Sequence, residues 1–159
     1  MKADVDPAPI HAFAESARMF CSFVESDVPP IDTEIDILWL LADLGRRVLA
    51  LPDVGTDGPD SDRREYVSDA RIMARFQALA VPDYWDIFKP FGDSPNEPVL
   101  NSVADDLRDI YLDLRPPLDS YDKGHLHTAS CLWRFSYWVH WGEHLSGAQR
   151  ALYLRRRDR

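Results

Sequence analysis

The sequence predicts an all-α fold, an up-and-down bundle of four long helices plus one shorter helix, in a single domain that covers residues 1–159. Apolar residues recur at helical spacing in successive segments, and no segment shows the alternation of a strand. Only 7 of the 159 residues are glycine, and 45% are apolar. This composition is enough for one core of ordinary domain size.

Two helices are expected in the N-terminal third. The first covers about residues 10–25, where Phe13 and Ala17 belong to an apolar set that recurs at intervals of three and four. The second covers about residues 33–51. Asp32 can cap its free N–H groups, and acidic residues fill its first turn, where the helix dipole favours anions.

The middle of the chain is expected to hold the shorter helix and a further long one. The shorter helix fits residues 65–79, and residues 82–88 fit one extra turn of helix. The next long helix is expected to begin near Pro98, which suits a first helical turn, and to end at Pro116 and Pro117. Its apolar seam consists of Leu100, Val103, Leu107, Ile110 and Leu114.

The final helix is expected over residues 125–156 and holds the most informative stretch of the chain. Three tryptophans, two histidines and one glutamate fall within Trp133–His144. His140 and His144 are four residues apart, so both imidazoles leave one face of a helix, a spacing that can bind a divalent metal. Glu143 directly precedes the second histidine, whereas zincins have a glutamate directly after the first. Further ligands would have to come from elsewhere, and the available donors are Asp105, Asp106, Asp109, Asp113, His125 and His127.

The acidic run on the preceding helix has two interpretations. Relative to the apolar seam, Asp109 points away from the core, which favours a solvated face. Alternatively, the edge formed by Asp106 and Asp109 meets the histidine side of the last helix and builds a His–Asp network that shifts proton affinities. On this second interpretation His140, His144, Asp106 and Asp109 are the candidate catalytic residues. The histidines then act as metal ligands or as acid–base groups, and otherwise they are polar caps of the core.

Charge and missing motifs exclude several classes of function. The net charge of -9 disfavours nucleic-acid binding, which needs the opposite sign. No apolar run approaches the roughly 20 residues of a membrane span, and no hydrophobic signal region begins the chain, so a cytoplasmic protein is expected. Cys21 and Cys131 are isolated from each other and suggest core residues rather than a zinc site. Phosphate-binding glycine loops are absent, and no cofactor is expected.

Several of these residues also carry a resemblance to a known family. The run Asp105–Tyr111, then Tyr121, Trp133–Phe135, His140–His144 and Ala148–Leu152 resembles a bacterial family known as a domain of unknown function. The likeness extends from Phe13 to Leu152. It implies a helical bundle and no particular reaction.

These observations leave three hypotheses for function, and they do not decide whether the protein is an enzyme. The first is a soluble binding or accessory module that acts as a homodimer or with a protein partner. The alternative is a metal- or acid/base-dependent hydrolase of a small phosphorylated or nucleotide-like molecule, to which Arg108 or Arg134 would offer positive charge. In the third, the histidine and aspartate residues only fix the register of the helices.

Overall fold

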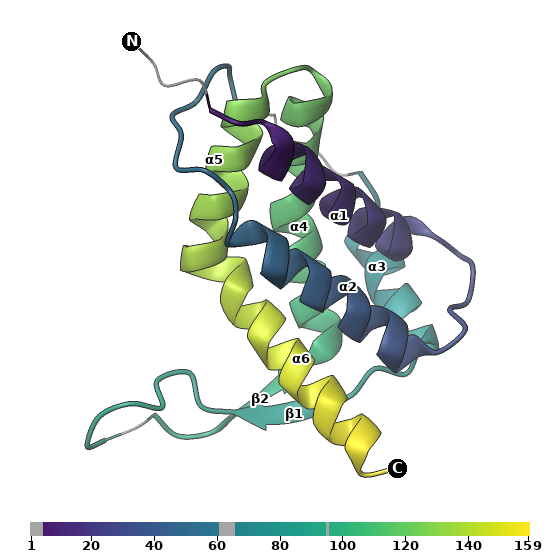
Figure 1. Cartoon of the computed structure of the whole chain (residues 1–159). Helices are drawn as coiled ribbons and strands as arrows, with labels where there is room; N and C mark the ends of the chain where they lie inside the picture. The colour runs from purple at the N-terminus through teal and green to yellow at the C-terminus, as the bar shows by residue number, and fades with distance from the viewer. Residues whose placement is uncertain (1–4, 61–65, 95) are drawn as a thin grey trace.

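A computed structural model describes residues 5–60, 66–94 and 96–159 and shows a mostly helical protein with one small two-stranded sheet (Figure 1). The elements in chain order are α1 (Ala8–Glu25), α2 (Thr33–Val48), α3 (Asp69–Ala78), β1 (Asp83–Asp86), β2 (Val99–Ser102), α4 (Val103–Asp122), α5 (Leu126–Ser136), the π-helical turn η1 (Tyr137–Trp141) and α6 (Gly142–Arg157). The predicted helical character is confirmed. The predicted arrangement of four long helices plus one shorter helix is not, because the C-terminal segment is divided and two strands interrupt the middle of the chain.

Helix α4 is the central element of the bundle. It packs against α1, α3, α5 and α6, and α2 packs against α1 and α6. Leu107, Ile110 and Leu114 of α4 are buried, as the predicted seam requires. The aromatic centre of the core forms where Phe13 of α1 meets Trp133 and Trp141, with ring centroids 5.0 and 6.2 Å apart. No helix among the described residues is long and apolar enough to cross a membrane.

The packing of α1 on α2 includes a half-buried carboxylate. Asp43 of α2 accepts hydrogen bonds from Ser16 of α1, from Arg46 at 2.9 Å and from Arg47 at 3.0 Å. Partial burial raises the pKa of Asp43, but the hydrogen bonds from Ser16, Arg47 and Arg46 outweigh it and hold this pKa below its usual value. The charged form of Asp43 therefore stabilises the contact between the two helices.

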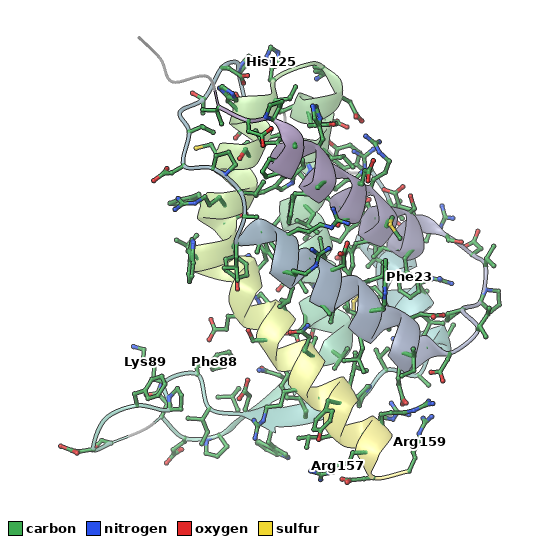
Figure 2. All side chains as sticks on the ribbon, viewed as in Figure 1. Phe23, Phe88, Lys89, His125, Arg157 and Arg159 are labelled. Atoms are coloured by element: carbon green, nitrogen blue, oxygen red, sulfur yellow. The ribbon has the colours of Figure 1, made fainter. Side chains whose placement is uncertain are left out.

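A β-hairpin replaces the helical turn expected at 82–88 and the helix start expected near Pro98. Strands β1 and β2 pair antiparallel, with Tyr84 opposite Asn101 and Trp85 opposite Leu100. Aromatic and β-branched residues favour these strands, and four residues per strand are too few to reveal an alternation in the sequence. The segment that joins the strands projects away from the helices as an arm, on which Phe88 and Lys89 lie (Figures 1 and 2).

Helix α4 continues through the two prolines at which it was expected to end. It begins where Ser102 caps the N–H of Ala104 and runs past Pro116 and Pro117 to Asp122. An interior proline costs a helix about 3 kcal/mol. Here the packing outweighs that cost, because Pro117 and Leu118 are buried and the Trp133 indole donates to the carbonyl of Leu114 at 3.1 Å.

Helix α5 has its N-terminus capped by the loop that follows α2. The side chain of His125, the N-cap residue, does not accept a hydrogen bond from the free N–H groups of the helix. Instead, Asp57 accepts from the backbone N–H of His127 at 3.1 Å and of Thr128 at 2.9 Å. Burial raises the pKa of Asp57, but these backbone hydrogen bonds outweigh it and lower the pKa. The loop is thereby fixed to the end of α5.

The single helix expected over residues 125–156 is divided by the turn η1. The chain changes direction at η1, so that α6 crosses the bundle at an angle to α5 (Figure 1). Trp133, before the turn, and Trp141, its last residue, are fully buried, whereas Trp138 within it is 67% exposed. π-Helical turns inside α-helices are frequent at functional sites, and this one contains His140.

Candidate functional site: a His–Asp cluster between α4 and α6

Two histidines from η1 and α6 face three aspartates of α4. His140 Nδ1 lies 2.6 Å from Asp113 Oδ2, and His144 Nδ1 lies 2.8 Å from Asp106 Oδ1. Asp109 lies between the two pairs along α4, and its Oδ2 is 3.5 Å from His144 Nε2. The rings of His140 and His144 meet edge to face with centroids 4.8 Å apart. These five residues are called the His–Asp cluster below.

The aspartate contacts determine which nitrogen of each imidazole is free. An ionised carboxylate only accepts hydrogen bonds, so the Nδ1 that faces it must carry the proton. In the neutral ring Nε2 then holds the lone pair. One ligand atom each from Asp109, His140 and His144 can be chosen so that all three lie within 4.8 Å of one another. Two imidazole nitrogens and one carboxylate oxygen of the cluster therefore lie close enough together to contact one small ion.

Two further side chains orient the aspartates. Arg108 donates to Asp109 Oδ1 at 2.8 and 3.0 Å, which leaves Oδ2 directed toward His144. The Tyr84 hydroxyl donates to Asp106 Oδ2 at 2.7 Å, on the oxygen that His144 does not use. Burial and this hydrogen bond raise the pKa of Tyr84, so its hydroxyl keeps its proton and remains a donor.

The electrostatic balance of the cluster is negative when the histidines are neutral. Among the described residues, these three carboxylates face one guanidinium, that of Arg108, which also lies 3.6 Å from Asp69 and from Asp105, so negative charge is in excess. The hydrogen bond with Asp106 raises the pKa of His144, against the lowering effect of its burial, and the charges of Asp106 and Asp109 act in the same direction. The local field thus favours positive charge at this place.

Gly142 makes the π-helical turn η1, which precedes His144, possible. A Cβ at this position would overlap with the carbonyl oxygen of Tyr137, five residues earlier, and would lie 3.0 Å from the Tyr137 ring. Only a residue without a side chain allows the π-helical turn to close here. The ring that lies against Gly142 is therefore that of Tyr137, at the start of the same turn.

Gly147 allows the β-hairpin to reach the cluster. A Cβ at Gly147 would overlap with the Tyr84 hydroxyl, the group that donates to Asp106. Arg150, on the same helix, lies 3.6 Å from Asp86 of β1. The hairpin is therefore seated on α6 and α4 beside the His–Asp cluster, and Tyr84 is its contact with the cluster.

The structure brings together all four residues proposed from the sequence. His140, His144, Asp106 and Asp109 lie within the contacts given above, and their catalytic role remains a hypothesis. The interpretation of the acidic run as a solvated face is wrong for Asp106, which is 4% exposed. It is also wrong for Asp109 and Asp113, whose side chains are 19% and 10% exposed.

Other candidates lie outside the cluster. Asp105 is more than half exposed, and its nearest cation is Arg108 at 3.6 Å. His125 lies at the end of the bundle opposite to the hairpin (Figure 2), where its ring packs over Gly58. Arg134 lies 3.4 Å from Asp53. Neither Arg108 nor Arg134 is thus a free cation for an anionic substrate.

Of the two other contributing residues, sequence reasoning named Asp113 only among the possible metal donors and missed Tyr84. Asp113 follows Asp109 by four residues and Asp106 by seven, a spacing that places all three on one helical face, so the signal was present. Tyr84 gave no such signal, because its contact with Asp106 depends on a hairpin that the sequence did not reveal.

Comparison with known proteins supports the fold. The family model described as a domain of unknown function (DUF5063) matches residues 6–156. The crystal structure of protein BF1032 from Bacteroides fragilis is similar with a TM-score of 0.72 and 21% sequence identity, over 91% of this chain and 90% of that chain. At this identity the likeness shows the fold alone. No curated protein matches the chain.

Proposed function

We propose that this chain, which belongs to the DUF5063 family, binds one divalent transition-metal ion through Asp109, His140 and His144 and uses it in a metal-dependent reaction. Asp106 and Asp113 orient the two imidazoles from behind, through their Nδ1 atoms. The His–Asp cluster would then be a metal site with three protein ligands.

One observation carries the proposal: two electron-pair acceptors face each other. Asp109 Oδ2 and the Nε2 of a neutral His144 are 3.5 Å apart, with both lone pairs in the same space. Such an arrangement needs a cation or a proton between the atoms. In a tetrahedral zinc site with bonds of about 2.0–2.1 Å, ligand atoms lie roughly 3.4 Å apart. The Asp109–His144 distance fits that value, and the three ligand atoms, which lie within 4.8 Å of one another, would draw slightly closer around an ion.

The surrounding groups support the same conclusion. Ligating histidines in metalloproteins nearly always donate their other N–H to a carboxylate or carbonyl, as His140 does to Asp113 and His144 to Asp106. The excess of negative charge among the described residues of the cluster favours a divalent cation. Two histidines and one carboxylate are also the ligand set of catalytic zinc sites and of non-haem iron(II) sites.

The ligand count favours a reaction over a structural role. Structural zinc sites are closed by four protein ligands, whereas catalytic ones leave a position for water or substrate. Three protein ligands leave that position here. A metal bound in this way lowers the pKa of a coordinated water and polarises substrate oxygens. We therefore favour a metal-dependent hydrolase. Arg108 and Arg134, which a phosphorylated substrate would need as partners, each already face a carboxylate, that of Asp109 and that of Asp53.

Metal content and affinity test the proposal. The protein is prepared without an affinity tag, stripped with a chelator and titrated calorimetrically with Zn²⁺, Fe²⁺, Mn²⁺ and Ni²⁺. We expect one ion per chain, with at least about 100-fold weaker binding after Asp109→Asn or His144→Ala, and about 10–100-fold weaker binding after Asp113→Asn. A folded wild-type protein that binds none of these ions would overturn the proposal.

Two matched controls separate the cluster from the general charge of the chain. Asp105→Asn removes one carboxylate from the same helix, and His11→Ala removes an exposed imidazole bonded to Tyr121. Both variants should bind metal like the wild type. If they lost as much affinity as Asp109→Asn, binding would be diffuse. If removal of His144 lowered stability and no ion bound to the wild type, the cluster would only fix the register of α4 and α6.

The remaining hypotheses stay predictions. They concern a homodimer or protein partner, a cytoplasmic location and an accessory role.

A further inference from the structure

A cleft of about 310 Å³ lies beside the His–Asp cluster, between α4 and the segment formed by α5 and η1. His140 and Asp113 line this cleft and also belong to the cluster, so the two spaces share a border. The apolar part of the lining consists of Leu112, Pro116, Pro117, Leu132, Phe135 and Val139.

Large apolar side chains of this cleft remain in contact with solvent. Leu112 is 48% exposed, Phe135 is 65% exposed and Val139 is 62% exposed. A ligand that covered them would remove apolar surface from water, which is favourable without any directional contact. The cleft therefore suits an apolar group rather than a polar one.

The charge of the described lining residues disfavours an anionic occupant. Asp60 and Asp113 line the cleft, and none of the described residues that line it is lysine or arginine. Among the described lining residues, an anion would meet like charge and no cation. A neutral or cationic group would not, and a metal ion at the neighbouring cluster would take up the polar end of the same molecule.

We infer that the substrate of this site has a metal-binding polar group joined to an uncharged apolar body, a single aromatic ring or a branched aliphatic chain, which lies in this cleft. The inference rests on the proposed function and specifies its substrate class. A cavity of about 150 Å³ can hold one benzene molecule, so the space here admits one ring with its linker.

A pair of hydroxamates tests the inference on the metal-loaded protein. Acetohydroxamate and benzohydroxamate share one metal-binding group and differ in the apolar body. Calorimetric titration of each into the zinc-loaded wild type is expected to give at least about tenfold tighter binding of benzohydroxamate, because the ring is buried in the cleft. The metal content is measured after each titration, so that binding and metal removal are distinguished.

A matched pair of variants locates the binding of the ring. Phe135→Ala removes an exposed wall of the cleft and should reduce the preference for benzohydroxamate to about threefold or less, with the acetohydroxamate affinity unchanged. Trp138→Ala removes an exposed aromatic side chain from the same segment that does not line the cleft, and should keep the full preference.

The outcomes separate this inference from the proposed function. Equal affinity of the two hydroxamates for the metal-loaded wild type would overturn the inference and leave the metal site standing. A preference that survives Phe135→Ala, or that is found equally in the metal-free protein, would also overturn it. Removal of the metal by both probes to the same extent would count as equal affinity. Failure of the wild type to take up any metal would instead overturn the proposed function and with it the inference.

Discussion

Replacing Gly142 by alanine tests whether the π-helical turn η1 positions the histidines. In an ordinary helix interior this change stabilises by about 1 kcal/mol, because alanine has the higher helix propensity. At position 142 the new Cβ would overlap with the Tyr137 carbonyl oxygen and would lie 3.0 and 3.1 Å from two carbons of its ring. Overpacking costs about 1–3 kcal/mol, so the free energy of unfolding should fall by up to about 2 kcal/mol.

Gly45 provides the matched control for this substitution. It also lies inside a helix, α2, but a Cβ there would meet only the two methyl groups of Leu145, at 3.5 and 3.9 Å, which are ordinary contacts. Gly45→Ala is therefore expected to raise the free energy of unfolding by roughly 0.5–1 kcal/mol. The two glycine variants should differ in sign although the chemical change is identical.

Urea denaturation followed by circular dichroism gives the stability of each variant, and calorimetry with Zn²⁺ gives its metal affinity. Gly142→Ala should bind the metal at least about tenfold more weakly, because a displaced turn moves His140. A gain of stability together with a loss of metal affinity would mean that the turn reverts to α-helix. That result would still show that the π-helical turn positions the histidines for metal binding. The reasoning would be refuted if Gly142→Ala matched Gly45→Ala in stability and retained wild-type affinity.

Three other contacts give predictions of their own. Tyr84→Phe and Gly147→Ala both remove the hydroxyl donor from Asp106, so zinc affinity measured by calorimetry should fall about tenfold in each; unchanged affinity would show that this contact is dispensable. Asp57→Ala removes the cap of α5 and should cost about 1–2 kcal/mol in urea denaturation, whereas wild-type stability would show that the cap contributes nothing. The pKa of Asp43 is lowered from 3.8, so its contribution is complete above that pH and is lost as the pH falls through the folded value. The stability difference between wild type and Asp43→Asn, measured by denaturation from pH 7 to pH 3, should therefore shrink below about pH 4, and a constant difference would contradict it.

The helices could be predicted from the sequence wherever one apolar face is regular. Residues 10–25 and 33–51 give α1 and α2 almost to their ends, because burial of one face decides these segments. Helix α3 begins at Asp69 rather than at residue 65, which lies outside the described residues. The hairpin was not predictable, because two four-residue strands depend on each other rather than on their own pattern.

The course of α4 shows where local rules give way to packing. Pro116 and Pro117 predict an end, and their local cost is real, but the helix is held from four sides and continues. Leu100 predicts the start of the seam, yet it lies on β2 and is 55% exposed. These two errors come from the same cause, since tertiary contacts decide the ends of this central helix.

The candidate site was predictable in its residues and not in its geometry. One of the two interpretations of the acidic run placed Asp106 and Asp109 against His140 and His144. The structure shows that arrangement. The helical wheel placed Asp109 away from the core, because it counted only the seam of α4 and assumed a straight last helix. The turn η1 shifts the angular position of every residue that follows it, and a uniform 100° per residue cannot represent that shift.

An ion held between Asp109 of α4 and the two histidines would join the middle of the bundle to the last helix as a removable cross-link. Its contribution would follow mass action, reaching about 2.7 kcal/mol when free metal exceeds the dissociation constant 100-fold. Preparations of one and the same polypeptide would then melt at temperatures that depend on the chelator in the buffer. If the proposed ion binds, thermal comparisons between variants of this chain would be meaningful only at a fixed concentration of free metal.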